Sequence, residues 1–202
     1  RELEHQLKDS GAKAIVIIEN FAHTLEQCIG HTPVKHVVLC AMGDLLGLLK
    51  GALVNYVVRK VKKMVPAFNL PQAVRFNEAV ARGTRATLRQ PELGPDDVAV
   101  LQYTGGTTGV SKGAVLLHRN VIANVLQSEA WNSPVMTKVP SGEQITTVCA
   151  LPLYHIFAFT VCMMLSMRNG GKVLLIPNPR DLPAVLKELS KHTFHSFPAV
   201  NT

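Results

Sequence analysis

Near its middle the chain reads Gln102-Tyr-Thr-Gly-Gly-Thr-Thr-Gly-Val-Ser-Lys-Gly113, directly after the apolar run Val98-Ala-Val-Leu101, which is typical of a buried strand. The glycines allow the backbone to approach a ligand closely and to adopt positive φ angles. The threonine hydroxyls add short hydrogen-bond donors, and Lys112 adds a positive charge. Together these features predict a phosphate-binding loop at residues 103–113.

Two well-known phosphate loops do not fit this stretch. A Walker A loop requires Gly-Lys-Ser/Thr, whereas Lys112 is preceded by Ser111 and followed by Gly113. A dinucleotide fingerprint requires Gly-x-Gly-x-x-Gly, and the glycines here have a different spacing. The loop therefore belongs to another class of nucleotide-handling protein.

The stretch resembles the signature of the adenylate-forming (AMP-binding) superfamily, Tyr/Phe-Thr-Ser/Gly-Gly-Thr/Ser-Thr-Gly-x-Pro-Lys-Gly. Residues 103–113 match every constrained position except one, because Ser111 stands where the family usually has proline. Since proline pre-sets φ, the serine is expected to loosen the loop, although it removes no phosphate ligand. So many coinciding positions make an ordinary glycine-rich turn a poor explanation.

A second block narrows the resemblance. The segment Leu151-Pro-Leu-Tyr-His-Ile-Phe-Ala158 is similar to the Leu-Pro-x-x-His-x-Phe/Gly block of acyl- and aryl-CoA synthetases. Together with Leu117-His-Arg-Asn120, it most resembles bacterial long-chain fatty-acid–CoA ligases. The chain opens without methionine and ends on Val200-Asn-Thr202, where the family normally continues. We therefore expect residues 1–202 to be part of the large AMP-binding N-terminal domain, with the C-terminal domain absent.

The resemblance implies a two-step reaction. A fatty carboxylate would attack the α-phosphorus of ATP, and coenzyme A thiol would then displace AMP from the acyl-adenylate. ATP, Mg²⁺, coenzyme A and a fatty acid are the implied cofactors and substrates. The family's Thr-Glu segment and its C-terminal lysine lie beyond Thr202, so these residues alone are expected to be inactive.

The resemblance also implies roles for individual residues. Lys112 and His155 are the expected catalytic residues: Lys112 would neutralise phosphate charge, and His155 would line the acyl–adenylate or thiol-entry path. Tyr154 and Phe157 would shape the acyl side of that path. Without the resemblance, a histidine in an apolar segment would be explained as a hydrogen-bonded core residue.

The loop residues are expected to hold the β- and γ-phosphates through backbone N–H groups, hydroxyls and one ammonium group. Thr107 is in addition the expected protein ligand of Mg²⁺. The expected nucleotide-binding residues are Thr104, Gly105, Gly106, Thr107, Thr108, Gly109 and Lys112.

Composition and periodicity predict an α/β fold, with a largely parallel sheet and helices on both faces. An apolar fraction of 47% and a charged fraction of 17% exclude a disordered chain. Trp131, near a helix end, is predicted to be core. Helices are predicted at residues 2–10, 21–29, 72–81, 118–131, 157–167 and 181–191, and strands at 14–18, 36–40, 98–103, 113–117, 145–150, 172–176 and 193–197.

The net charge of +7 is unevenly distributed, since no acidic residue occurs between Asp44 and Glu78. Within that interval, residues 45–64 combine an apolar half with a basic end. Two interpretations fit: a helix that covers the domain core, or peripheral contact with an anionic membrane. Nucleic acid is not an expected partner, because no aromatic or reading motif accompanies the lysines.

Residues 145–167 lack charged side chains and are long enough to cross a bilayer. Pro152, Tyr154 and His155 interrupt them, which favours a strand, a loop and a buried helix. The four cysteines have no metal or disulfide spacing, and three sit in apolar runs. The expected location is the cytoplasm, with membrane contact at its inner face as the open addition.

Two other functions remain open at this level. The chain could belong to an adenylate-forming enzyme for aryl or other acids. It could also be a non-catalytic nucleotide- or membrane-binding module that retains the loop without the remaining machinery. The sequence patterns do not indicate an oligomeric state.

Overall fold

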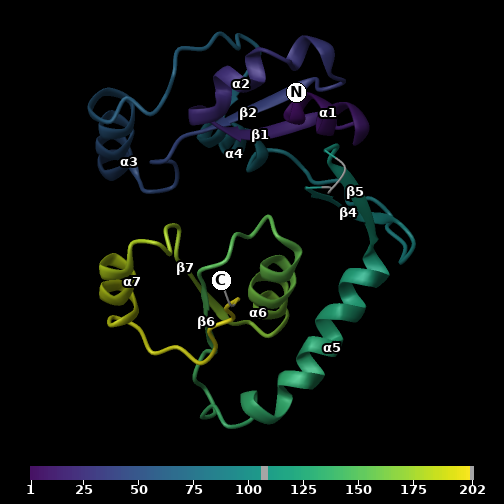
Figure 1. Cartoon of the computed structure of the whole chain (residues 1–202), viewed down its shortest axis with the longest axis vertical. Helices are drawn as coiled ribbons and strands as arrows, with labels where there is room; N and C mark the ends of the chain where they lie inside the picture. The colour runs from purple at the N-terminus through teal and green to yellow at the C-terminus, as the bar shows by residue number, and fades with distance from the viewer. Residues whose placement is uncertain (106–108, 201–202) are drawn as a thin grey trace. The chain divides into compact units, whose positions relative to one another are not determined.

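The computed structural model describes residues 1–105 and 109–200 (Figure 1). The chain divides into two compact units. The N-terminal unit comprises Arg1–Glu92 and Tyr103–Gly113, and the C-terminal unit comprises Leu93–Gln102 and Ala114–Thr202.

A parallel sheet of order β1-β2-β3 forms the centre of the N-terminal unit. Its strands are β1 (Ala14–Ile18), β2 (His36–Cys40) and β3 (Val74–Arg75), and the predicted bounds of β1 and β2 are confirmed. The prediction of helix from residue 72 was wrong for β3, which pairs with Val38 and Leu39. A two-residue ladder is too short to leave a period in the sequence, so only the tertiary pairing reveals it.

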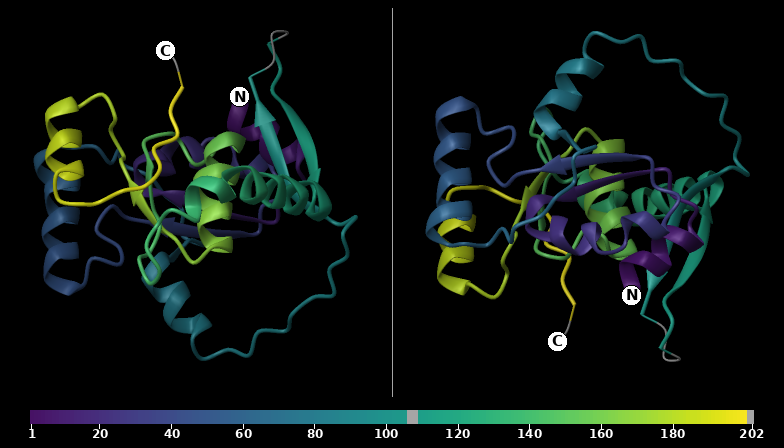
Figure 2. Two further views of the ribbon diagram at one scale, coloured as in Figure 1. Left: turned by 90° about the horizontal axis from the view of Figure 1, so that it is seen from below. Right: turned by 90° about the horizontal axis from the view of Figure 1, so that it is seen from above.

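Helices α1 (Glu2–Asp9) and α2 (Ala22–Glu26) share a core with one face of this sheet. Leu7 of α1 and Leu25 of α2 pack with Val37 and Leu39, which project to the same face because they alternate along β2. Helix α4 (Phe76–Gly83) packs against β2 and β3 on the other side (Figures 1 and 2). Short 3₁₀ turns, η1 (Glu19–Phe21) and η2 (Ile29–His31), flank α2.

The basic segment folds as α3 (Leu48–Tyr56), which continues directly into the π-helical turn η3 (Val57–Val61). Two glycines let α3 approach the preceding loop closely, because a Cβ atom on Gly43 would lie 2.3 Å from the carbonyl oxygen of Gly51. The Gly43 N–H also donates to Asn55 Oδ1 at 2.8 Å. These contacts dock α3 through its small residues and leave its leucines at the surface.

An ion cluster around one buried carboxylate joins η3 to the sheet. Glu19, directly after β1, is only 1% exposed. Arg59 donates to both of its carboxylate oxygens, at 2.7 and 2.8 Å, and Arg75 donates at 3.0 Å. The bidentate geometry is the strong form of this interaction. Two of the basic residues in the acid-free interval therefore neutralise Glu19.

The C-terminal unit contains a parallel pair, β6 (Thr146–Cys149) and β7 (Lys172–Leu175). Helix α7 (Leu182–Leu189) covers one face, where Val148 packs with Val185. The π-helical η4 (Ala158–Met164) and the following α6 (Leu165–Arg168) cover the other, where Cys149 packs with Cys162 (Figure 1). Helices on both faces of a parallel pair confirm the predicted α/β layering.

One detail of this unit differs from prediction. The predicted strand at residues 193–197 is wrong, since this segment forms an isolated bridge between Ser196 and Thr147. Its backbone is still satisfied, because Ser196 O accepts from Val148 N–H at 2.8 Å. The charge-free run at 145–167 is a strand, a turn and a helix as predicted. None of the helices described here is long and apolar enough to span a bilayer.

Strands β4 (Val98–Thr104) and β5 (Lys112–Leu117) pair in a sheet of their own, so the strands described here are divided among three sheets. Helix α5 (His118–Met136) follows directly, and Leu117 N–H donates to Asn120 Oδ1 at 2.9 Å at its start. The core prediction for Trp131 was wrong, because its side chain is 86% exposed. Val121 and Val125 form the buried stripe of α5, and the helical period places Trp131 away from it.

Candidate functional site

The predicted phosphate loop connects the last residue of β4, Thr104, to the first residue of β5, Lys112. Both residues are exposed, as is Gly105. Gly109 adopts φ +86°, a left-handed conformation that favours glycine. The predicted binding residues Gly106, Thr107 and Thr108 lie outside the described residues. The structure therefore places four of the seven predicted nucleotide-binding residues at one exposed connection.

Ser111 closes the base of this loop. Its hydroxyl donates to the carbonyl oxygen of Thr104 at 3.2 Å and accepts from Gln6 Nε2 at 3.4 Å. Its carbonyl oxygen accepts from His5 Nε2 at 2.9 Å. The residue that departs from the family signature thus supplies hydrogen bonds across the loop and to α1 that the sequence pattern did not indicate.

Tyr103 lies on β4, next to the residue from which the loop leaves the strand. Its hydroxyl donates to Asp9 Oδ2 at 2.5 Å. That hydrogen bond raises the pKa of the Tyr103 phenol above its usual range, so the phenol stays protonated as a donor. The ring also packs against Gly113, where an added Cβ atom would lie 3.1 Å from the ring. Glycine at this position lets the aromatic ring and the strand approach each other.

His155 lies in the C-terminal unit, at the turn that begins the helix after β6. Its backbone N–H donates to Pro152 O at 2.9 Å, and its Nδ1 accepts from the Phe157 N–H at 3.3 Å. Because Nδ1 is an acceptor, the neutral ring carries its proton on Nε2. The imidazole is exposed, so His155 is a helix-capping residue with a donor available at the surface and not a core histidine.

An open hollow of about 380 Å³ lies beside this turn, within the C-terminal unit. Its volume falls within the range of small-molecule sites. Tyr154 is not among the residues around it and is 82% exposed, while its carbonyl oxygen accepts from Gln102 Nε2 at 2.8 Å. The residues that line the hollow are Leu116, Asn120, Val121, Asn124, Ile156, Phe157 and Thr160.

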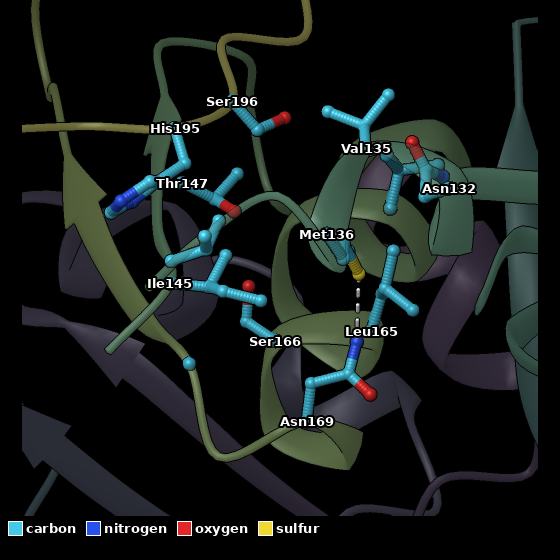
Figure 3. Close-up of a pocket in the computed structure, with 13 residues that line it drawn as sticks. Asn132, Val135, Met136, Ile145, Thr147, Leu165, Ser166, Asn169, His195 and Ser196 are labelled. Atoms are coloured by element: carbon cyan, nitrogen blue, oxygen red, sulfur yellow. Dashed lines mark hydrogen bonds between the residues drawn. The ribbon is translucent and has the colours of Figure 1, made fainter. Parts of the chain in front are cut away.

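A smaller cavity of about 80 Å³ lies between α5, α6 and β6 (Figure 3). That volume is well below the range of ligand sites and corresponds to space for a few water molecules. His195 at its edge is fully engaged: Nδ1 accepts from Thr146 N–H at 3.0 Å, and Nε2 lies 3.2 Å from Glu143. Asn169 donates to Met136 Sδ at 3.6 Å. The side chains of His195 and Asn169 are therefore engaged by other residues of the same unit.

Neither metal ligands nor a reactive thiol is apparent in the described part of the chain. No group of three His, Cys, Asp or Glu side chains there is arranged to hold a metal ion. Cys28, Cys149 and Cys162 are buried. Burial, followed by the neighbouring Cys149, raises the pKa of the Cys162 thiol to about 12, so this thiol is not a nucleophile at neutral pH.

Comparison with known proteins supports the family resemblance that the loop sequence indicated. The family of AMP-binding enzymes matches residues 1–202, and the chain belongs to that family. It is 54% identical over its whole length to a long-chain-fatty-acid–CoA ligase of Escherichia coli O157:H7 and 49% identical to the ligase of Haemophilus influenzae. The chain spans 35% and 36% of the length of these two relatives.

Solved structures show the same fold. A long-chain-fatty-acid-CoA ligase from Archaeoglobus fulgidus aligns with a TM-score of 0.54 and 23% identity, over 95% of this chain and 31% of its own. Apo MatB from Rhodopseudomonas palustris aligns with a TM-score of 0.57 and 22% identity, over 95% of this chain and 30% of its own. At these identities the likeness concerns the fold alone.

Sequence reasoning missed the residues of α1 that contact the loop. His5, Gln6 and Asp9 are separated from their loop partners by about a hundred positions along the chain. Their helix was predicted, but no spacing in the sequence links its polar side to the loop. A histidine, an amide and a carboxylate on one short helix are also common on solvated surfaces.

Proposed function

We propose that the full-length protein, a chain of the length of its curated relatives, is an ATP-dependent long-chain fatty-acid–CoA ligase. The observation that carries this proposal is 54% identity to such a ligase across all 202 residues. The exposed loop between Thr104 and Lys112 is consistent with it, because backbone N–H groups, hydroxyls and one ammonium group suit polyphosphate.

The proposed chemistry has two steps. A carboxylate oxygen forms a bond to the α-phosphorus of ATP and pyrophosphate leaves; the thiol sulfur of coenzyme A then forms a bond to the acyl carbon and AMP leaves. Neither step needs a covalent enzyme intermediate, so positioning and charge stabilisation supply the catalysis. Lys112 would stabilise negative charge on the phosphates, and Thr104, Gly105 and Gly109 would orient them.

Mg²⁺ suits a loop of this kind, because it prefers phosphate and water oxygens with few protein ligands. When bound, it would supply further neutralisation of the phosphates. The threonine proposed as its ligand is Thr107, while Thr104 presents an exposed hydroxyl at the start of the loop.

His155 would bind through Nε2–H at the acyl or thiol side of the reaction. Its capping bond to Phe157 N–H orients the ring, and Phe157 lines the neighbouring hollow of about 380 Å³. Apolar residues predominate around that hollow, which suits an acyl or pantetheine chain better than a charged group. Tyr154 remains a weaker candidate for the same role.

A substrate panel on the full-length protein tests the proposal. With ATP, Mg²⁺ and coenzyme A, we expect kcat/KM for a long-chain acid to exceed that for a four-carbon acid by at least about 100-fold, because each buried methylene adds favourable transfer free energy. AMP release measures the rate. A preference for aromatic acids would favour an aryl-CoA ligase. Nucleotide binding without adenylation of any acid would favour a non-catalytic module.

The surface of α3 and η3 favours a second property, peripheral contact with an anionic membrane through residues 45–64. Leu48 and Leu49 are 93% and 90% exposed, an unusual environment for leucine on a helix. Lys60, Lys62 and Lys63 are exposed at and after the following turn, and residues 45–64 contain no acidic residue. An apolar helix with a basic end is complementary to an anionic headgroup layer above acyl chains.

Charge removal tests the membrane contact. In the full-length protein, replacing Lys60, Lys62 and Lys63 with glutamine is expected to weaken binding to vesicles containing phosphatidylglycerol by roughly 100-fold at low salt, at about 1 kcal/mol per lysine. The effect should shrink at high salt because the charges are screened. Vesicle sedimentation measures it. A matched control removes three exposed lysines elsewhere, Lys138, Lys172 and Lys187; equal weakening by both sets would contradict a specific surface.

A further inference from the structure

The loop and α1 meet through polar side chains, within the N-terminal unit. His5 and Gln6 contact Ser111, and Asp9 accepts from Tyr103 on the strand that enters the loop. The apolar side of the same helix is used differently, since Leu7 is buried in the core of the unit. Helix α1 therefore connects the loop to the core of the sheet.

Ser111 is the centre of this contact. A hydroxyl can donate one hydrogen bond and accept two, and Ser111 donates to Thr104 O while accepting from Gln6. Its donor bond spans the loop, because Thr104 and Ser111 lie on either side of residues 105–110. Its carbonyl oxygen is held by His5 at 2.9 Å. One residue thus fixes the separation of the two ends of the loop and its position relative to α1.

We propose that α1 is a positioning element for the phosphate loop, which acts through His5 and Ser111 to hold the two described ends of the loop in place for nucleotide binding. This inference rests on the proposed function, because it assumes that the loop binds ATP. Fixing a backbone group in place costs conformational entropy, and that cost opposes binding when it falls at the moment a ligand binds. Hydrogen bonds that already hold Thr104 and Ser111 reduce this cost at the two ends of the loop. They take the place of the proline that would stiffen the loop locally.

The hollow beside the loop supports the assignment. His5 and Ser111 line an open space of about 560 Å³ together with Gly105 and Gly109. The described ends of the loop and the polar side of α1 therefore face the same space. A change in α1 would be transmitted directly to the residues proposed to orient phosphate.

Nucleotide binding by variants of the full-length protein tests the proposal. His5→Ala and Ser111→Ala are each expected to raise KM for ATP, and Kd for a non-hydrolysable ATP analogue, by roughly fivefold, the equivalent of one net hydrogen bond. KM for the fatty acid and for coenzyme A should not change. His5→Gln should restore much of the affinity, because its amide nitrogen can donate to Ser111 O. His23→Ala, on α2 of the same unit, is the matched control.

Several outcomes would overturn the proposal. One is an analogue affinity within twofold of wild type for both His5→Ala and Ser111→Ala. Another is an equal rise in KM for all three substrates together with a lower melting temperature, which would make α1 a structural helix only. Failure of the ligase assignment is distinguishable: a wild-type protein that binds the analogue without forming acyl-CoA still allows the affinity comparison. A wild-type protein that does not bind the analogue would refute the positioning role.

Discussion

Lys112→Ala is expected to lower kcat/KM for acyl-CoA formation by about 100-fold in the full-length protein, the effect typical of removing one preorganised electrostatic contact to a developing charge. Lys112 begins β5, so its ammonium group is attached to a paired strand at the end of the loop. Pyrophosphate release in the absence of coenzyme A isolates the adenylation step, where the loss should appear. Lys112→Arg keeps the charge but changes its shape, and we expect it to recover only part of the rate.

Lys172→Ala is the matched control for this prediction. Lys172 is likewise an exposed lysine at the first residue of a strand, β7, and lies in the C-terminal unit away from the loop sequence. Its replacement should leave kcat/KM within about twofold of wild type, because surface substitutions away from special features have small effects. Equal losses in both variants, or an unchanged rate for Lys112→Ala, would remove Lys112 from its proposed role.

Glu19→Ala is expected to destabilise the N-terminal unit by about 3 kcal/mol, near the lower end for breaking a buried ion pair. The carboxylate is 1% exposed, and its loss leaves Arg59 and Arg75 without their shared acceptor. The cost is reduced because the two arginines are 38% and 54% exposed and can regain water. Hydrogen–deuterium exchange should show lower opening free energies for the amides of β1 and η3.

Two further variants make this result specific. Glu19→Gln keeps the shape and one acceptor oxygen but loses the charge, so it should cost less than Glu19→Ala; equal costs would indicate that the charge, and not the packing, holds the site. Glu78→Ala removes the partner of Arg82 on the exposed side of α4 and should change exchange very little, since exposed pairs contribute little. A change in β1 and η3 exchange as large as that of Glu19→Ala would show that the measurement is not local.

Much of the fold follows from local sequence. Residues 14–18 and 36–40 are short and β-branched, and such runs are stable mainly as strands covered by other elements. The helix predicted from residue 181 begins with a local cap, because Asp181 Oδ1 accepts from Ala184 N–H at 3.2 Å. In both cases the signal itself, a run of apolar residues or a capping side chain three positions from its partner, lies within a few residues, so the sequence is sufficient to predict the element.

The errors have a common physical origin. β3 is strand because Val38 and Leu39 pair with it, and the segment around Ser196 forms an isolated bridge to Thr147 and not a strand. Trp131 is exposed because the buried stripe of α5 is already provided by its valines. Each result depends on which distant residues are adjacent in space, and no local propensity contains that information.

The same division applies to the predicted phosphate loop at residues 103–113. The sequence alone determined its glycines, its lysine and its family, because the predicted phosphate cradle would be built from contiguous residues. Only the tertiary structure placed His5, Gln6 and Asp9 against it and made Ser111 a hydrogen-bonded contact in place of a missing proline. The reason is that a hydrogen bond depends on distance in space, and about a hundred residues of folded chain separate these partners.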